Sequence, residues 1–195
     1  MNSRLLYMSL SIIVLTLSTS AVYAFVYQQR SHAVTQIIIN VSDILRPDGA
    51  GTITELIPSG EPANWQCVDD AGGGDGDSSY VYSSGAAKRD TYRMQDHPSK
   101  TGTIRNVTVN VRVRRVGLGI GSAMTVLRTH GSEYNGNLGI LTASYSVRST
   151  TYEKNPFTGE DWTWEEIDNL EAGVRLGSLG GSSRCTQVWI VVNLA

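Results

Sequence analysis

The chain has 195 residues, a formal net charge of −2 and 41% hydrophobic residues. Its 16 basic and 18 acidic residues are interspersed, whereas a protein that binds nucleic acid through phosphate attraction carries a basic stripe. We therefore expect no nucleic-acid partner. Behind an N-terminal targeting segment, the chain is long enough for one domain with a sizeable core and too short for two.

The N-terminus is a long apolar segment that follows Arg4 and contains no other charged residue before Arg30. A basic residue, an apolar stretch and a small-residue site, here residues 22–24, are the parts of a secretory signal. The stretch is also long enough to cross a bilayer as a hydrophobic helix. Residues 1–27 are thus predicted to be a cleaved signal peptide or a retained membrane anchor. In both cases the rest of the protein is exported and lies outside the cell or at its surface.

The remainder is predicted to be a short polar linker, residues 28–34, and one β-sandwich domain, residues 35–195. Residues 35–44 alternate between apolar and polar side chains, as in a strand. This strand can pair within its own domain, or it can be donated to the open edge of another copy of the protein. Residues 47–51 are predicted to form a turn and residues 52–57 a second strand.

Two cysteines occur in the chain, Cys67 in a predicted strand at residues 65–68 and Cys185 near the C-terminus. An exported protein is in a compartment that permits disulfides, and an even count leaves no spare thiol. We therefore predict a bridge between Cys67 and Cys185. The alternative is that they are two unrelated buried thiols.

A loop rich in glycine and aspartate, DDAGGGDGDSS, occupies residues 69–79. Calcium takes several oxygen ligands, and aspartates at alternate positions of a glycine-rich turn can converge on one ion. The terminal glutamate of an EF-hand is missing, so further ligands would have to come from elsewhere. The alternative is a flexible solvated loop. The candidate calcium ligands are Asp69, Asp70, Asp75, Asp77 and Ser79.

The clearest element is a strand at residues 103–116, in which valine occupies every second position. A period of two predicts one face in the core and the other in water, so Arg112 and Arg114 should point to solvent. Asn106 is on the polar face and begins a glycosylation sequon; a second sequon begins at Asn40. Both are candidate glycosylation sites on an exported protein. Further strands are predicted at residues 80–83, 90–94, 124–129, 141–152 and 174–176.

One short helix is predicted to begin after Thr163, which forms a capping box with Glu166. Trp162 and Ile167 are placed for a hydrophobic staple. The helix is too short to be stable alone, so we expect it to lie on the sandwich. Residues 187–194 form the last strand, which should be central because such an apolar edge would aggregate. Many short strands and one short helix predict an all-β, jelly-roll-like β-sandwich.

Several segments resemble uncharacterised jelly-roll modules from exported proteins of archaea and bacteria and from phage surface proteins. They are NWQCVDD, DGDSSYVYSS, TIRNVTVNVRVRR, NPFTGEDWTWEEIDNLEAGVRLGS and CTQVWIVVNL. The most specific part is the turn-helix that contains Asn155, Pro156, Trp162, Thr163 and Trp164. This group is related in architecture to carbohydrate-binding modules. The resemblance implies the fold and surface exposure, and it implies no catalytic residues.

No catalytic pattern is apparent. His32, His97 and His130 have no metal-ligand spacing and are predicted to be surface residues. The dipole of the predicted helix favours acidic residues in its first turn, which explains their presence there without a catalytic role. We therefore predict a non-enzymatic structural or adhesive protein at the cell surface, with a filament or coat subunit as one form of this function. The alternative is a carbohydrate-binding module with a structural calcium ion and an aromatic platform. The expected partners are glycans, other copies of the chain and, through an uncleaved N-terminus, the membrane.

Overall fold

A computed structural model describes residues 42–98 and 101–195. The predicted signal peptide or anchor, the linker, residues 35–41 with the Asn40 sequon, and His32 lie outside the described residues. Within residues 42–98 and 101–195, no helix is long and apolar enough to cross a membrane.

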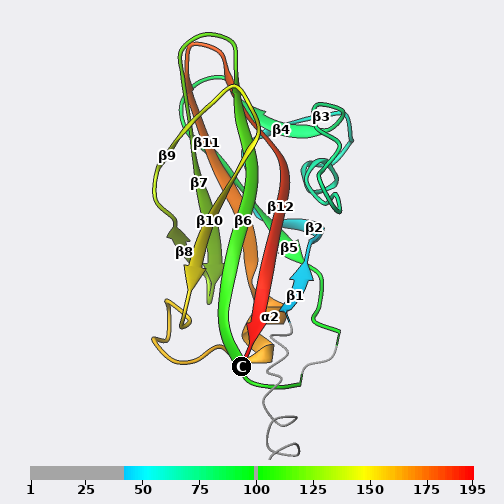
Figure 1. The fold of residues 1–195 in the computed structure, drawn as a ribbon, viewed down its shortest axis with the longest axis vertical. Helices are drawn as coiled ribbons and strands as arrows, with labels where there is room; N and C mark the ends of the chain where they lie inside the picture. Colours follow the sequence, from blue (N-terminus) through cyan, green and yellow to red (C-terminus); the bar gives the residue numbers. More distant parts are fainter. Residues whose placement is uncertain (1–41, 99–100) are drawn as a thin grey trace, which may run out of the picture. The chain divides into compact units, whose positions relative to one another are not determined.

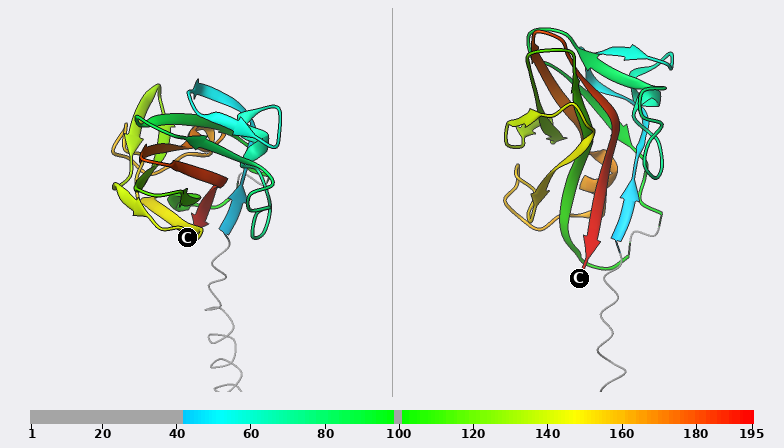
Figure 2. Two further views of the ribbon diagram at one scale, coloured as in Figure 1. Left: turned by 90° about the horizontal axis from the view of Figure 1, so that it is seen from above. Right: turned by 45° about the horizontal axis from the view of Figure 1, so that its top comes forward.

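Two antiparallel sheets of six strands each form a sandwich (Figures 1 and 2). The first sheet has the order β10 (Ser146–Tyr152), β6 (Ile104–Val116), β12 (Ser182–Leu194), β4 (Tyr80–Ser83) and β3 (Ile57–Ser59), and β1 (Ser42–Leu45) also pairs with β12. The second has the order β2 (Pro47–Thr54), β5 (Lys88–Met94), β11 (Glu171–Leu179), β7 (Ile120–Thr129) and β8 (Ser132–Asn135), with β9 (Gly139–Leu141) paired to β7. The predicted all-β sandwich with one short α-helix is confirmed.

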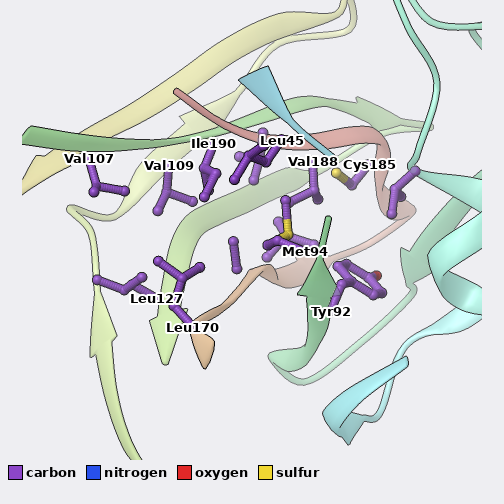
Figure 3. Packing of buried hydrophobic residues seen from close by; sticks show 14 of the residues in the cluster. Leu45, Tyr92, Met94, Val107, Val109, Leu127, Leu170, Cys185, Val188 and Ile190 are labelled. Atoms are coloured by element: carbon purple, nitrogen blue, oxygen red, sulfur yellow. The ribbon is translucent and has the colours of Figure 1, made fainter. Parts of the chain in front are cut away.

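The core lies between the two sheets, and β6 supplies one wall of it as the period-two pattern predicted. Val107, Val109, Val111 and Val113 are all 0% exposed. They face Leu127 of the second sheet and Leu170, which precedes β11 (Figure 3). Each fully buried aliphatic side chain contributes about 1.5–3 kcal/mol, so this layer holds the two sheets together.

Strand β12 is central in the first sheet, as its apolar sequence predicted. It pairs with β6 on one side along most of its length. On the other side it pairs with β4 at residues 183–185 and with β1 at residues 190–193. The gap between these two partners is closed by the chain after Cys67, since the carbonyl of Val68 accepts a hydrogen bond of 2.9 Å from the Val188 amide.

The described end of the N-terminal strand, β1, pairs antiparallel with β12 of its own domain. Ile44 faces Val191 in this register, and Leu45 is buried in the core. Intramolecular pairing, one of the two alternatives for residues 35–44, therefore holds for the part that the structure describes.

Three local predictions are wrong. Residues 47–51, predicted as a turn, begin the edge strand β2, where register shifts accommodate the proline and glycines; an edge strand tolerates proline because its amide need not donate. A strand was predicted at residues 65–68, but residues 65–67 belong to a 3-10 helix, η1 (Asn64–Cys67), and Val68 follows it. The single strand predicted at residues 141–152 is split into β9 and β10, which belong to different sheets.

The one α-helix is α2 (Trp164–Asn169), and its predicted capping box is confirmed. The Glu166 amide donates to Thr163 Oγ1 at 3.2 Å, and the Thr163 amide donates to Glu166 Oε2 at 2.8 Å. Ile167 is buried in the core cluster. The capping box satisfies two amides that would otherwise lack partners, and packing of Ile167 fixes this six-residue helix on the sandwich.

Candidate functional site

A cleft of about 610 Å³ opens between the turn that follows β7 and the helix α2. We call it the His130 cleft. Its lining is mainly polar and comes from two segments that are far apart in the sequence. The lining residues are Thr129, His130, Gly131, Thr163, Glu165, Glu166 and Asn169.

His130 has an unusual backbone conformation, with φ of 51°, and it is the one non-glycine residue of the described chain with a positive φ. Such conformations cost of order 1–3 kcal/mol and are concentrated at functional sites. The ring is held on two sides. Its Nδ1 lies 3.0 Å from Thr129 Oγ1, and its plane is stacked on Phe157 with 4.6 Å between centroids and an interplanar angle of 4°.

Phe157 is presented by a loop that the buried side chain of Asn155 organises. Asn155 Oδ1 accepts a hydrogen bond of 2.9 Å from the Phe157 amide, and its Nδ2 donates to Thr129 Oγ1 at 3.3 Å. The Asn155 amide also donates to the Glu160 carbonyl at 2.9 Å. The loop is therefore fixed to the end of β7, next to His130, although half of the Phe157 side chain, 50%, stays exposed.

The carboxylates of the cleft come from the first turn of α2. Glu166 Oε1 lies 3.7 Å from His130 Nε2, while its Oε2 closes the capping box. Glu165 is exposed, and its carbonyl accepts a hydrogen bond of 2.7 Å from Asn169 Nδ2. The cleft thus contains the His130 ring among several polar groups, and Phe157 packs against that ring without being one of the lining residues. His130 is exposed, as predicted, whereas its stacking on Phe157 depends on contacts that no sequence pattern encodes.

The candidate calcium ligands contact protein groups in this structure. Asp77 accepts hydrogen bonds from Tyr145 Oη at 2.9 Å and Arg184 Nη1 at 3.1 Å, and it also pairs with Arg114. Burial opposes ionisation of Asp77, but these donors outweigh it, and its pKa lies below the usual value. The carboxylate is therefore already neutralised by two guanidinium groups.

The other acidic residues of the loop interact among themselves. The Asp75 amide donates to Asp70 Oδ2 at 3.1 Å, and Ser79 Oγ donates to Asp75 Oδ2 at 2.9 Å. Burial, together with the nearby Asp75, raises the pKa of Asp70, and burial, together with Asp70, raises the pKa of Asp69. Among the described residues, no group of three or more acidic, histidine or cysteine side chains is placed to hold a metal ion. Calcium binding by this loop stays a prediction, and any such site would need backbone carbonyls or ligands other than a cluster of these side chains.

The loop at residues 69–79 instead covers part of the outer face of the first sheet. Gln187 Nε2 donates to the carbonyls of Asp70 and Gly72, at 2.9 and 3.2 Å. Thr186 Oγ1 donates to the Ser79 carbonyl at 3.1 Å. Arg112 and Arg114, predicted to point into solvent, lie over the Tyr145 ring beneath this loop. The loop is thus a structural part of the sandwich.

Cys67 and Cys185 are both buried free thiols, so the predicted disulfide is not formed in this structure. Their sulfur atoms contact different backbone groups: Cys67 Sγ lies 3.7 Å from the Ser59 carbonyl, and Cys185 Sγ lies 3.2 Å from the Gln187 carbonyl. Burial raises the pKa of Cys185 to about 12. The alternative of two separate buried thiols describes the structure.

His97, predicted to be a surface residue, is only 2% exposed. Its Nε2 contacts the Asp43 carboxylate of β1, and its amide donates to Asp168 Oδ1 of α2 at 3.2 Å. Asn106 is half-buried, and its Nδ2, the atom that a glycan would modify, donates to Glu153 Oε2 at 3.3 Å. Glycosylation of Asn106 stays a prediction.

The tryptophan and tyrosine residues that could form a sugar platform are dispersed. Trp162 belongs to the core, Trp164 stacks on His97, and Tyr80 lies under the Arg184 guanidinium at 4.1 Å. Trp189 faces outward from the first sheet, opposite Asn110 in the register, and is half-buried. Phe157 is exposed and stacks on His130, which lines the cleft.

No protein-family model matches the sequence, and no curated protein matches it. Solved structures of similar fold do exist. They include the xylan-binding CBM22-1 domain of Paenibacillus barcinonensis Xyn10C, with 11% identity over 80% of this chain and 98% of that chain and a TM-score of 0.42. A CBM6 module of Cellvibrio mixtus lichenase 5A has 11% identity, coverage of 78% and 97%, and a TM-score of 0.40. A cyclase from Fischerella sp. TAU has 11% identity, coverage of 79% and 86%, and a TM-score of 0.39. These similarities concern the fold alone.

Proposed function

We propose that this protein is an exported, non-enzymatic adhesive domain that binds glycans in the His130 cleft. The observation that carries the proposal is the stacked pair of Phe157 and His130 beside a polar cleft of about 610 Å³. The strained backbone of His130 supports it, because the chain retains a costly conformation at this position.

A sugar ring has an apolar face of C–H groups and a rim of hydroxyls, and the cleft together with the adjoining Phe157 ring offers complements to both. The exposed Phe157 ring supplies an apolar surface with few rotatable bonds, which a sugar can cover. Thr163, Glu165 and Asn169 supply hydroxyl, carboxylate and amide groups that donate to or accept from hydroxyls. Sites of this kind fix a ligand through a few placed polar groups around an apolar surface.

The carboxylates support binding without hydrolysis. A glycosidase places two carboxyl groups on either side of the bond that it cleaves. Glu165 and Glu166 are consecutive residues in the first turn of α2, and the Glu166 carboxylate already accepts the Thr163 amide. Our proposal is therefore a binding function, with the protein outside the cell as the sequence predicts.

Neither calcium nor strand donation is part of the proposal. Asp77 is neutralised by arginines, and β1 pairs with β12 of its own domain. A filament or coat subunit would therefore need a contact other than a donated β1.

Binding of the full chain to a glycan array tests the proposal. We expect at least one glycan class to bind, and Phe157→Ala to weaken that binding about tenfold or more, in line with the loss of an aromatic contact of roughly 1.5 kcal/mol. Trp189→Ala, on the outer face of the first sheet, is the matched control and should bind normally. Absence of binding to any glycan, or loss with Trp189→Ala and not with Phe157→Ala, would contradict the proposed site.

A further inference from the structure

Two connections between the sheets lie side by side at the end of the sandwich opposite Ser42 and the C-terminus (Figure 1). One joins β6 to β7 and the other joins β11 to β12. Their most exposed side chains are aliphatic: Leu118 is 90% exposed, Leu179 75% and Ile120 54%. We call these three residues the apolar tip.

Glycines hold the two connections against each other. A Cβ atom on Gly119 would lie 2.0 Å from the Leu179 carbonyl oxygen, and one on Gly181 would lie 2.3 Å from the Val116 carbonyl oxygen. Both glycines also have positive φ, at 104° and 103°, a region that glycine enters without steric cost. The two backbones are therefore in direct contact, and the leucines project from a fixed support rather than from a loose loop.

The strands that carry the apolar tip are basic. Residues 102–132 and 172–195 contain no aspartate and no glutamate. Asp77 pairs with Arg114 and Arg184, while Arg115 forms no ion pair within residues 42–98 and 101–195. Arg115 lies beside the tip, and its Nη1 donates to the Gly117 carbonyl at 2.6 Å. The tip thus combines exposed aliphatic groups with positive charge.

We propose that the apolar tip inserts into the headgroup region of an anionic lipid surface. The aliphatic side chains leave water for the boundary of the acyl chains, and Arg115 reaches the phosphate and carboxylate groups of the lipids. Long arginine side chains can lie along the apolar boundary while their charged ends stay in the polar layer. This site is independent of the His130 cleft.

The size of the tip favours lipid over a protein partner. A stable protein–protein interface buries about 1,200–2,000 Å² in total. Three aliphatic side chains expose only a few hundred Å², roughly 60–120 Å² each by the usual transfer coefficient. A second copy docked tip to tip would therefore bury too little area. A lipid surface has no such threshold, because each side chain partitions into it separately.

A fluorescent label beside the tip tests this in the full chain. The two natural cysteines are buried, so Ser182→Cys supplies a single accessible thiol and keeps all three apolar side chains in place. An environment-sensitive dye at this position should shift to the blue with phosphatidylcholine vesicles that contain about one-third phosphatidylserine. Lipids with a quencher in the acyl chain should quench it. The measured quantity is the depth of the label in the bilayer. Binding alone would not test the tip, because the N-terminal apolar segment can bind lipid by itself.

Matched variants decide between the outcomes. The double variant Leu118→Ser/Leu179→Ser, made in the labelled chain, should bind the vesicles at least tenfold more weakly, as the label reports. A dye attached instead to the acidic loop, through Ala71→Cys, should show no shift in its emission. Near-ultraviolet circular dichroism checks that each variant is folded. The proposal is overturned if no vesicle shifts the label at position 182, if the double variant shifts equally, or if neutral and anionic vesicles act alike. A shift that appears with protein concentration in the absence of lipid would assign the tip to a second copy and would also overturn it.

Discussion

The ring of His97 packs on the indole of Trp164, with 4.1 Å between centroids and an angle of 37°. This contact joins the segment after β5 to the helix α2. His97 also contacts Asp43 of β1, so one buried side chain links three elements that are separated in the sequence. Helix α2 also lines the His130 cleft. Because His97 contacts this helix, it supports an element on which the cleft depends.

We therefore expect His97→Ala to destabilise the protein by about 2–4 kcal/mol, since it leaves a cavity against Trp164 and removes a partner of Asp43. The measurement is the free energy of unfolding in denaturant at neutral pH. His97→Phe is the matched variant: it keeps a ring against Trp164 and should lose less. Equal stability of the wild type and His97→Ala would show that the histidine does not tie these elements together.

Asp90 is a second buried polar residue on which several segments depend. Its carboxylate accepts hydrogen bonds from the amides of Glu55 and Leu56, at 2.7 and 2.8 Å, from Asn64 Nδ2 at 2.6 Å and from Tyr92 Oη at 3.0 Å. Removing the carboxylate leaves these buried donors without an acceptor. Asp90→Ala should cost about 3 kcal/mol or more, measured by equilibrium unfolding.

Asp48→Ala is the control for Asp90, because Asp48 pairs with Arg93 at the surface. An exposed pair contributes about 0–1 kcal/mol. Similar losses for the two variants would contradict the role given to the buried carboxylate.

Asp77 should make stability depend on pH. Its pKa is lower in the folded protein than in the unfolded chain. Its contribution to the free energy of unfolding is therefore fully present above the pKa of the unfolded chain, about 4, and is lost as the pH falls through the pKa of the folded protein. Because Asp77 is partly exposed, we expect the effect to be small, about 0.2–1 kcal/mol. Asp77→Asn should be less stable than the wild type at pH 7, and the difference should disappear near pH 2.

The same residue provides a test for metal. Since arginines neutralise Asp77, millimolar calcium and a chelator should give the same melting temperature. A calcium-dependent rise would mean that the loop at residues 69–79 binds the ion in an arrangement other than this one.

Two substitutions of His130 should differ in their effect on stability. Its φ of 51° strains any side chain except glycine. His130→Gly relieves this strain, whereas His130→Ala keeps it and loses the contacts with Phe157 and Thr129. We expect His130→Gly to be more stable than His130→Ala by about 1 kcal/mol, and both to bind glycan more weakly than the wild type. Thermal unfolding and the glycan array give the two readouts.

The two cysteines should be unreactive in the native protein. Both are 0% exposed, and burial raises the pKa of Cys185 to about 12, so little nucleophilic thiolate is present. A thiol reagent should modify neither in the folded state and two per chain after unfolding in denaturant. Absence of reactive thiols after unfolding would show that the exported protein forms the bridge between Cys67 and Cys185.

The sequence by itself determined the sandwich, the buried face of β6 and the start of α2. These features follow from local rules. When valine alternates with polar residues, only one orientation of the strand buries the valines. The side chains of Thr163 and Glu166 accept hydrogen bonds from the free amides at the start of the helix. The central place of β12 also follows, because an apolar strand is unstable at an edge. Such inferences need no knowledge of which segments meet.

Only the tertiary structure decided what the polar residues do. Asp77 was expected to bind calcium, and in the structure it meets arginines of β6 and β12, 37 and 107 positions further along the chain. Phe157 and His130 form a candidate site because Asn155 fixes one turn to another. A carboxylate, an imidazole or a phenyl ring has the same local preferences whether it lies in solvent or against a distant partner. The role of each therefore depends on which strands the fold places together.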